Sequence, residues 1–394
     1  MRPRTGTRRE QGERPSVEGR RDLGGSAGNS APGHETNLDL PPPALPSVSV
    51  VCHTQRRVHL LPALAEAVLS DPVARELIFV TEDPESMRAL AALRVQHRRL
   101  ETLQVGGLPH HAALDAGIAL AKSEVVLLLD DDVLPGPGLA SGHARHHAAA
   151  QGLVVMGYMP VKLSTKRRPA DIAEHLYSAD YEHHCNRIEA GETGVLDELW
   201  TGNVSASRAD CLRVGIESPL FTAFYHADRD LGLRLADAGL YGVFDRALGA
   251  THLHTRSTAE FLRDSERQGR GRVALWRAQS GRLGNLDPTL TLADLPVPVR
   301  AAVRAAGGTR LAVPAARTLI AMGVFLGHVR LWRAEVLLAK LARRVMQVRG
   351  VTAELKVSEV PRGASQSRER VTRRARMTAP PPSGSSSLPP ARPT

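Results

Sequence analysis

The sequence is poor in cysteine, in aromatic residues and in long apolar runs, and each shortage excludes a class of protein. Its three cysteines, Cys52, Cys185 and Cys211, are odd in number and show no Cys-x-x-Cys spacing, which argues against a disulfide framework and predicts a reducing compartment. Aromatic residues make up only 4% of the chain, so base stacking is disfavoured and no nucleic-acid partner is expected. No apolar run is long enough to span a bilayer, and the arginine-rich N-terminus lacks the apolar segment of a secretory signal. We therefore expect a cytoplasmic protein.

Two common nucleotide-binding motifs are also missing. No GxGxxG fingerprint follows the first predicted strand, and no P-loop is present, which disfavours the commonest dehydrogenases and kinases. The two ends of the chain, 1–45 and 357–394, are rich in Arg, Gly, Ser and Pro and have no periodic apolar pattern. We expect both ends to be disordered tails.

Between these tails, strand and helix patterns alternate from Pro46 onward. Short apolar runs predict strands at 47–51, 77–80, 103–105, 125–129 and 240–244. Helical apolar spacing predicts helices at 58–69, 89–95 and 112–121. Because each of these helices connects two consecutive strands, the strands are expected to pair in parallel. The sequence thus predicts an α/β domain with a nucleotide-binding half.

Three consecutive aspartates, Asp130, Asp131 and Asp132, directly follow the apolar run 125–129. A buried strand would deliver them to the carboxyl edge of the sheet, where open α/β sheets bind ligands. Clustered carboxylates repel one another, and a hard cation such as Mg²⁺ or Mn²⁺ together with a phosphate would offset this repulsion. The alternative for an isolated cluster of this kind is an acidic, solvated turn.

The order of several further motifs resembles family 2 glycosyltransferases of the GT-A fold. The resemblance rests on Pro46–Val51 with Thr54 and Arg57, on the strand 76–80 ending in Thr81 and Glu82, on Asp115 after a glycine loop, and on the three aspartates. Further on, 200–205 resembles that family's TGN motif and 226–235 its ED-type motif. The resemblance covers residues 46–275 and implies a Rossmann-like nucleotide-diphospho-sugar transferase fold with a mixed central sheet. Residues 276–356 would follow as a basic, partly amphipathic helical extension.

The resemblance also implies a role for each matching residue. Asp132 would bind Mn²⁺ or Mg²⁺, which takes up charge on the departing nucleoside diphosphate. Asp228, expected to open a helix over 228–238, would be the general base that deprotonates an acceptor hydroxyl, with inversion at the anomeric carbon. A structural helix cap is the alternative role for Asp228. The nucleotide sugar would contact Thr54, Arg57, Thr81, Glu82, Asp115, Asp130 and Asp131, and the sugar and acceptor side would include Trp200, Gly202 and Asn203.

Some positions depart from the family pattern. Thr81 stands where an Asp is usual, and Ala227 where a Glu is usual, so donor preference and one acceptor contact are in doubt. His53 and Gln55 replace a common Pro and a common aromatic residue in the first loop, which weakens any expectation of base stacking there.

Several histidines and arginines lie outside these motifs. His252 and His254, after a predicted linker at 245–250, share one face of an extended segment, and His254 is the slightly preferred second metal ligand. The pairs His183-His184, His110-His111 and His146-His147 are expected on helix surfaces, since no second ligand pair at zinc spacing accompanies them. Arg267, Arg270 and Arg272, around two glycines, predict a flexible basic loop that either closes over a diphosphate or is simply solvated.

The segment from Arg300 to Gly350 carries ten Lys and Arg residues against one acid, Glu335. Apolar residues at helical spacing, among them Leu331, Leu338 and Val345, alternate there with arginines and predict a basic amphipathic helix. One interpretation is peripheral attachment to an anionic membrane face, which would suit a lipid-linked acceptor. The other is a helix that packs on the core with solvated arginines.

Two other functions remain open at this stage. A nucleotidyltransferase would use a similar acidic strand end, but usually with a glycine-rich phosphate loop, and it would leave Asp228 without a role. A non-catalytic protein on a transferase scaffold is suggested by Thr81 and Ala227. The sequence does not identify the sugar, the base or the acceptor, because pocket shape determines these.

Overall fold

A computed structural model describes residues 44–218, 225–253, 255–279 and 287–357. The expected tails, 1–45 and 357–394, lie almost entirely outside these residues, so their disorder stays a prediction. The three cysteines are described, and all are free and buried.

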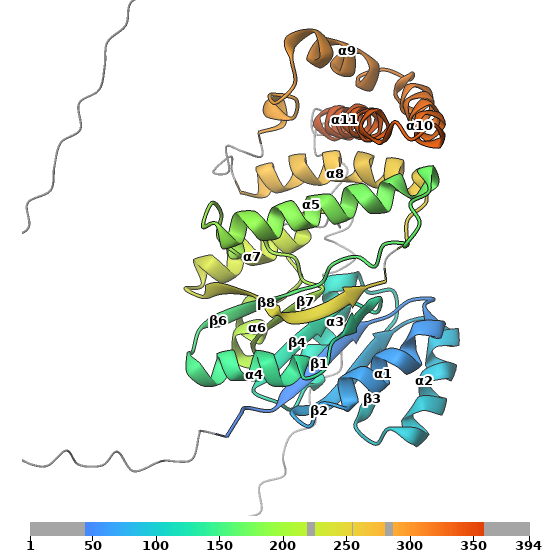
Figure 1. Cartoon of the computed structure of the whole chain (residues 1–394). Helices are drawn as coiled ribbons and strands as arrows, with labels where there is room; N and C mark the ends of the chain where they lie inside the picture. Colours follow the sequence, from blue (N-terminus) through green and yellow to red (C-terminus); the bar gives the residue numbers. More distant parts are fainter. Residues whose placement is uncertain (1–43, 219–224, 254, 280–286, 358–394) are drawn as a thin grey trace, which may run out of the picture. The chain divides into compact units, whose positions relative to one another are not determined.

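The described residues contain one mixed sheet with the strand order β3-β2-β1-β4-β7-β6-β8-β5 (Figure 1). The strands β3, β2, β1 and β4 are parallel, whereas β7 runs antiparallel to both β4 and β6. Beyond them, β8 is parallel to β6 and antiparallel to β5. The strands are β1 (Val48–His53), β2 (Ala74–Thr81), β3 (Leu100–Gln104), β4 (Val125–Leu129), β5 (Val133–Pro135), β6 (Leu153–Tyr158), β7 (Asn203–Ser207) and β8 (Tyr241–His252). The predicted mixed α/β architecture is confirmed.

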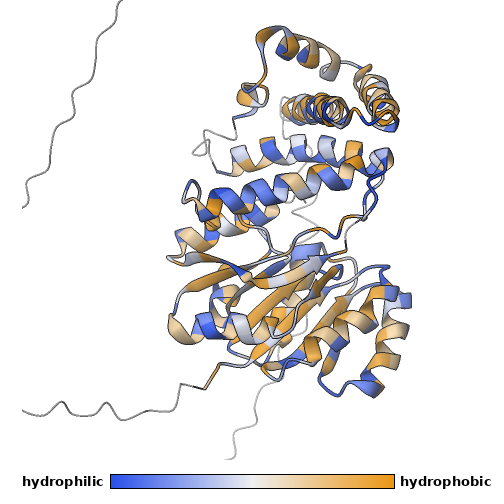
Figure 2. Ribbon diagram, viewed as in Figure 1, coloured by the Kyte–Doolittle hydropathy of each residue, from blue (hydrophilic) through white to orange (hydrophobic). Residues whose placement is uncertain are grey.

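Helices cover both faces of this sheet, whose strands are mostly apolar (Figure 2). Val48, Val50 and Cys52 of β1 pack with α1, α2 and α4, while Val51 packs with α3, α6 and α7. Successive side chains of a strand point to opposite faces, so one strand supplies both cores. The helices are α1 (Leu61–Leu69), α2 (Pro84–Gln96), α3 (His110–Leu120), α4 (Leu139–Ala149), α6 (Arg208–Val214) and α7 (Ala227–Asp237), with short 3-10 turns η1 (Val58–Leu60), η2 (Pro169–Asp171), η3 (Leu196–Glu198) and η5 (Pro288–Leu290).

The C-terminal helices build a third apolar core together with α5 and α8. The predicted helical extension is therefore present, although its expected start after residue 275 falls inside α8. Val345 and Val348 of α11 are buried in this core. Leu331, expected on the same apolar face, is exposed just before α11, so only part of the predicted face packs inside the protein. The helices are α5 (Ile172–Glu189), α8 (Thr258–Ala278), α9 (Val297–Gly307), α10 (Ala312–His328) and α11 (Trp332–Val357).

The glycines of α8 allow a close helix crossing, which corrects the expected basic loop at 267–272. A Cβ on Gly269 would lie 2.1 Å from the carbonyl oxygen of Gln347, and one on Gly350 would lie 2.0 Å from that of Glu266. Glycine is required here because the backbones of α8 and α11 touch, rather than because the chain is flexible.

The predicted strand at 240–244 also differs from the structure, because it continues through the expected linker at 245–250 to His252. Pairing with β6 on one side and β5 on the other supplies hydrogen-bond partners along β8.

Candidate active site

A cavity of about 1210 Å³ lies at the carboxyl ends of β1 and β4, between the sheet and helices α5, α7, α8 and α11. Its lining brings together Asp130, Asp131, Asp132, Asp228 and Trp200, which are separated by up to a hundred residues in the sequence. The cavity is where the strand topology predicts a ligand site.

Arg57 links two of the three aspartates. It forms an ion pair with Asp131, and its Nη2 lies 3.0 Å from Asp132 Oδ2. Asp131 is buried and also accepts hydrogen bonds from Thr54 Oγ1 at 2.9 Å and from the Gln55 amide at 3.3 Å. Asp131 is thus committed to contacts within the protein, and Thr54 supports it rather than lining the cavity.

Asp132 faces His252, whose Nε2 lies 3.3 Å from its Oδ1. The backbone sets this pair, because β5 and β8 place Val133 opposite His252 and the Leu253 amide donates to the Asp132 carbonyl at 2.7 Å. His254, the preferred ligand in the sequence, lies outside the described residues. His252, the other histidine considered, lies beside the acidic cluster.

The acidic cluster fits a divalent cation. Two ligands bound at 90° to a Mg²⁺-sized ion, each at about 2.1 Å, lie roughly 3 Å apart, close to the Asp132–His252 separation. Among the described residues no group of three or more His, Cys, Asp or Glu side chains converges on one point. A pair is nevertheless sufficient for an ion that takes its remaining ligands from substrate phosphates and water.

Asp130 completes the acidic edge of the cavity. Burial, followed by the charges of Asp132 and Asp228, raises the pKa of its carboxyl to about 7. Gly202 packs against it closely, since a Cβ at that position would lie 2.7 Å from Asp130 Oδ2. Gly202, predicted on the sugar and acceptor side, does not itself line the cavity and is close-packed against Asp130.

Asp228 lines the same cavity, in the first turn of α7, with 41% of its side chain exposed. Thr201 Oγ1 donates to its Oδ1 at 2.9 Å, and His111 Nε2 lies 3.5 Å from the same oxygen. Burial by itself would raise the pKa of the carboxyl, but the contacts with His111 and Thr201 outweigh it and lower the pKa. The N-cap position of α7 is His226, so Asp228 does not occupy the cap that was its alternative role.

The pair His110-His111 lies in the cavity wall, which corrects its expected place on a helix surface. These residues begin α3, just after the carboxyl edge of the sheet, and His53 Nδ1 lies 2.8 Å from His110 Nδ1. Burial, followed by the charges of His111 and His53, lowers the pKa of His110 to about 4. Their position at the start of a helix after β3 was the signal that could have identified them.

An aromatic group surrounds Trp200 in the cavity wall. His184 stacks on its ring with centroids 5.3 Å apart, and the rings of Tyr181 and Tyr177 lie at 4.9 and 5.6 Å. His184 is also buried and lies 3.2 Å from Glu198, so its predicted surface position is wrong. His183 is exposed as expected, but at the cavity lining.

Four predicted binding residues have partners elsewhere and do not line the cavity. Thr81 accepts from the Asp83 amide, and Glu82 accepts from the Gly107 amide and from Gln55. The Asp115 carboxylate accepts hydrogen bonds from the backbone amides of Ile216 and Glu217. The side chain of Asn203 forms one hydrogen bond with His143 Nε2 and donates another to the Leu248 carbonyl. These contacts favour structural roles, above all for Asp115 and Asn203.

The pair His146-His147 was also expected on a helix surface, but both side chains contact other elements. His146 Nε2 lies 2.8 Å from Asp245 Oδ2, and His147 Nε2 lies 2.8 Å from the Ser205 hydroxyl. Both contacts join α4 to strands of the sheet, and they were invisible in the sequence because the partners are about 60 to 100 residues away.

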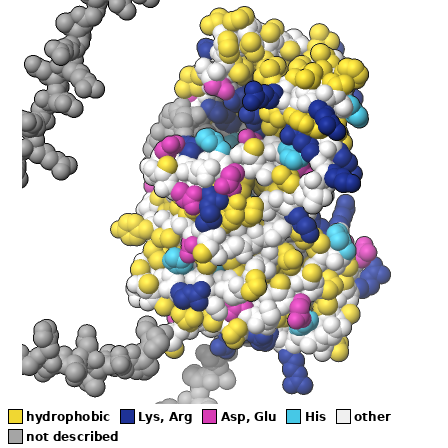
Figure 3. All heavy atoms as spheres, viewed as in Figure 1, with side chains coloured by type: hydrophobic (Ala, Val, Ile, Leu, Met, Phe, Trp, Pro, Cys, Tyr) yellow, Lys and Arg dark blue, Asp and Glu magenta, His cyan; other side chains and the backbone are white. Residues whose placement is uncertain are grey.

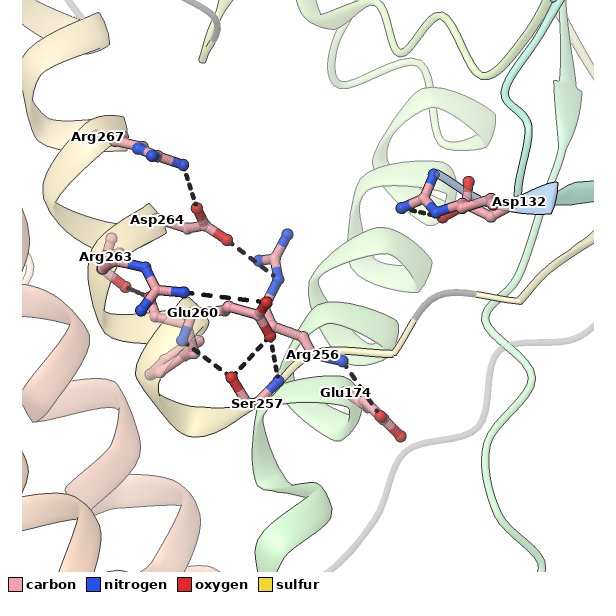
Figure 4. A network of polar contacts seen from close by, with 11 residues as sticks. Asp132, Glu174, Arg256, Ser257, Glu260, Arg263, Asp264 and Arg267 are labelled. Carbon is pink, nitrogen blue, oxygen red and sulfur yellow. Dashed lines mark hydrogen bonds and ion pairs between the residues drawn. The ribbon is translucent and has the colours of Figure 1, made fainter. Parts of the chain in front are cut away.

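Basic side chains from α8, from the loop before it and from α11 complete the cavity, and Figure 4 shows those of Arg256 and Arg267 apart from Asp132. Arg256 and Arg267 lie 3.3 and 3.4 Å from Asp264 on α8. From α11, Arg344 and Gln347 also line the cavity, and sequence reasoning had assigned neither to a site. The helical extension thus contributes directly to the site.

Comparison with known proteins identifies the fold. No protein-family profile matches the sequence, and no curated protein matches it significantly. Among solved structures, the mannosyltransferase PcManGT from Pyrobaculum calidifontis, in complex with GDP-Man and Mn²⁺, is similar with a TM-score of 0.52 and 16% identity over 79% of this chain and 89% of its own. A mycobacterial protein is similar with a TM-score of 0.40 and 16% identity over 59% of this chain and 74% of its own. The chain therefore has an α/β fold of the kind found in a nucleotide-sugar glycosyltransferase.

Proposed function

We propose that the protein is a metal-assisted, inverting family 2 glycosyltransferase that moves a sugar from a nucleoside-diphosphate sugar to an acceptor hydroxyl. The proposal rests above all on one cavity that is lined both by the pair Asp132 and His252 and by Asp228. The similar fold of a mannosyltransferase in complex with GDP-Man and Mn²⁺ supports the donor class and the metal.

On the donor side, Asp132 and His252 would hold Mn²⁺ or Mg²⁺, which when bound neutralises charge on the diphosphate. Arg57 keeps Asp132 and Asp131 in place through its two ion pairs. Asp130, at the same edge, faces the donor.

On the acceptor side, Asp228 takes the proton from the acceptor hydroxyl. The acceptor oxygen then bonds to the anomeric carbon as the bond from that carbon to the diphosphate breaks, and attack from the opposite face inverts the configuration. The Asp228 carboxylate is ionised at neutral pH, and its lowered pKa makes it a weaker base than an ordinary aspartate, so its contribution comes from its position beside the acceptor hydroxyl. Trp200 offers an apolar ring to one face of a sugar.

GDP-mannose with Mn²⁺ is the first donor to test by calorimetry, followed by a panel of other nucleotide sugars. We expect Mn²⁺-dependent binding that weakens by about 10–100-fold or more in Asp132→Ala, because a ligand of the metal is lost. Glu85→Ala removes an exposed carboxylate on α2 away from the cavity and should bind like wild type. Equal Mn²⁺-dependent affinity in Asp132→Ala and wild type would contradict the assigned metal site.

The products of turnover separate the alternative functions. Release of a nucleoside diphosphate supports glycosyl transfer, whereas release of pyrophosphate would identify a nucleotidyltransferase. If no nucleotide sugar is hydrolysed or transferred in the presence of Mn²⁺, the protein is a non-catalytic member of this fold.

A further inference from the structure

The C-terminal helices expose a group of large apolar side chains that no described part of the protein covers. Phe325 is 68% exposed, Leu311 66% and Leu337 58%. Together with three neighbours they extend along α10, the turn after it and the start of α11: Leu311, Met322, Phe325, Val329, Leu331 and Leu337. Single exposed apolar residues are ordinary, but such a concentration on adjoining elements indicates an interaction surface.

Helix geometry places these residues in stripes. At 3.6 residues per turn, Leu311, Met322, Phe325 and Val329 project from one side of α10, opposite its buried Ala316 and Ile320. On α11, Arg333, Leu337 and Lys340 share an exposed stripe in the same way. The exposed turn 329–331 connects the two stripes along the chain.

Cations flank the apolar residues of this face. Five of them are exposed and form no described ion pair: Arg310, Arg317, Arg330, Arg333 and Lys340. The acid of this segment, Glu335, is buried, and Arg167 donates to it at 2.8 Å, so it does not cancel their charge. Figure 3 shows hydrophobic side chains gathered over α9 and α10, with Lys and Arg side chains beside them. We call the six apolar and five basic residues the apolar-basic face.

We propose that the apolar-basic face docks the protein on an anionic membrane surface. Apolar side chains enter the boundary between headgroups and acyl chains, while the surrounding cations meet anionic headgroups. No described helix is long and apolar enough to cross a bilayer, which fits helices that lie on the surface. A second copy of the chain fits poorly, because a self-complementary contact would bring five cations against five.

Docking through this face would also orient the cavity. Arg344 and Gln347 line it from α11, only one to two turns beyond Lys340. If the proposed transferase function holds, an acceptor presented by the bilayer would approach the basic end of the cavity. The docking itself does not depend on that function, because lipid binding needs neither donor nor acceptor.

The test is co-sedimentation of the full chain with vesicles of phosphatidylcholine alone or mixed with phosphatidylglycerol. We expect binding to the mixed vesicles that weakens with salt, and little binding to phosphatidylcholine. The double variant Phe325→Asp/Leu337→Asp and the triple variant Arg317→Glu/Arg333→Glu/Lys340→Glu should each reduce partitioning by more than about tenfold. Val95→Asp changes a side chain that is 85% exposed on α2 and should bind like wild type.

Three outcomes would overturn the proposal: no sedimentation of wild type, equal sedimentation with both vesicle types, or wild-type binding by both variants. A dimer of wild type in light scattering that Phe325→Asp/Leu337→Asp converts to a monomer, without any vesicle binding, would identify a second copy as the occupant. Unchanged melting temperatures establish that the variants fold, which is expected because every altered side chain is exposed. Nucleotide binding by the variants reports separately on the proposed function.

Discussion

At the scale of single residues, the position of Asp228 allows its proposed role as a base to be tested separately from any role in stabilising α7. Its carboxylate accepts a hydrogen bond from the Thr201 hydroxyl and lies beside His111. The N-cap position of α7 is occupied by His226. The side chain can therefore be changed with little effect on the helix, beyond the favourable interaction of a negative charge with the helix N-terminus, about 0.3–1 kcal/mol.

Asp228→Asn should retain donor and metal binding but lower the rate of transfer by roughly 10²–10⁴-fold, because the amide accepts the Thr201 hydrogen bond but not a proton. Initial rates with saturating donor and acceptor measure this effect, and Asp237→Asn, at the far end of the same helix, is the control. Transfer within a few-fold of wild type would remove Asp228 from the role of base.

At the scale of elements, the crossing of α8 and α11 joins the sheet domain to the helical extension. Gly269 and Gly350 let the two backbones touch, and the same helices carry Arg267 and Arg344 into the cavity. Stability and site geometry are therefore coupled at this crossing.

Gly269→Ala should destabilise the protein by about 1–3 kcal/mol, because the new methyl group would overlap the Gln347 carbonyl oxygen. This loss exceeds the gain of about 1 kcal/mol that Ala usually brings to a helix interior. Gly106→Ala is the matched control, since its Cβ would meet nothing within 4 Å. Denaturant unfolding midpoints of the two variants and wild type measure these changes in stability. A more stable Gly269→Ala variant would show that the two helices separate easily.

At the scale of the whole molecule, the buried His143 and the half-buried His110, His147 and His226 contribute to the response to acid. Burial lowers the pKa of His143 to about 3, and it lowers those of His110, His147 and His226 to about 4. Each remains neutral in the folded state at a pH where the unfolded chain, with a pKa near 6.5, binds a proton. Their contribution to stability is therefore complete above about pH 6.5 and is lost as the pH falls toward 4.

The free energy of unfolding should fall by up to about 1.4 kcal/mol per pH unit for each such histidine across this window. Urea unfolding at a series of pH values between 7.5 and 4.5 measures the slope. His143→Gln, which preserves a hydrogen-bonding side chain, should make the curve less steep. A stability that stays constant over this range would contradict the buried, neutral state of these imidazoles.

Local patterns in the sequence determined the alternation of strands and helices, the three aspartates at a strand end, and Asp228 in the first turn of a helix. Hydrophobic periodicity and strand-end position depend on neighbouring residues, so one sequence suffices to predict them. The same reasoning failed for the glycines of α8, because a helical glycine in a close crossing and a glycine in a loop look alike in sequence.

The tertiary structure alone decided which distant side chains meet. His111 lies beside Asp228, His252 faces Asp132, and Arg344 reaches the cavity from the last described helix. Contacts between residues about a hundred or more positions apart cannot be predicted from neighbouring residues, because they depend on how complete elements pack. The same holds for the burial of a side chain. For the same reason, the amphipathic pattern of α11 did not reveal which of its apolar residues are buried in the core and which stay on the surface.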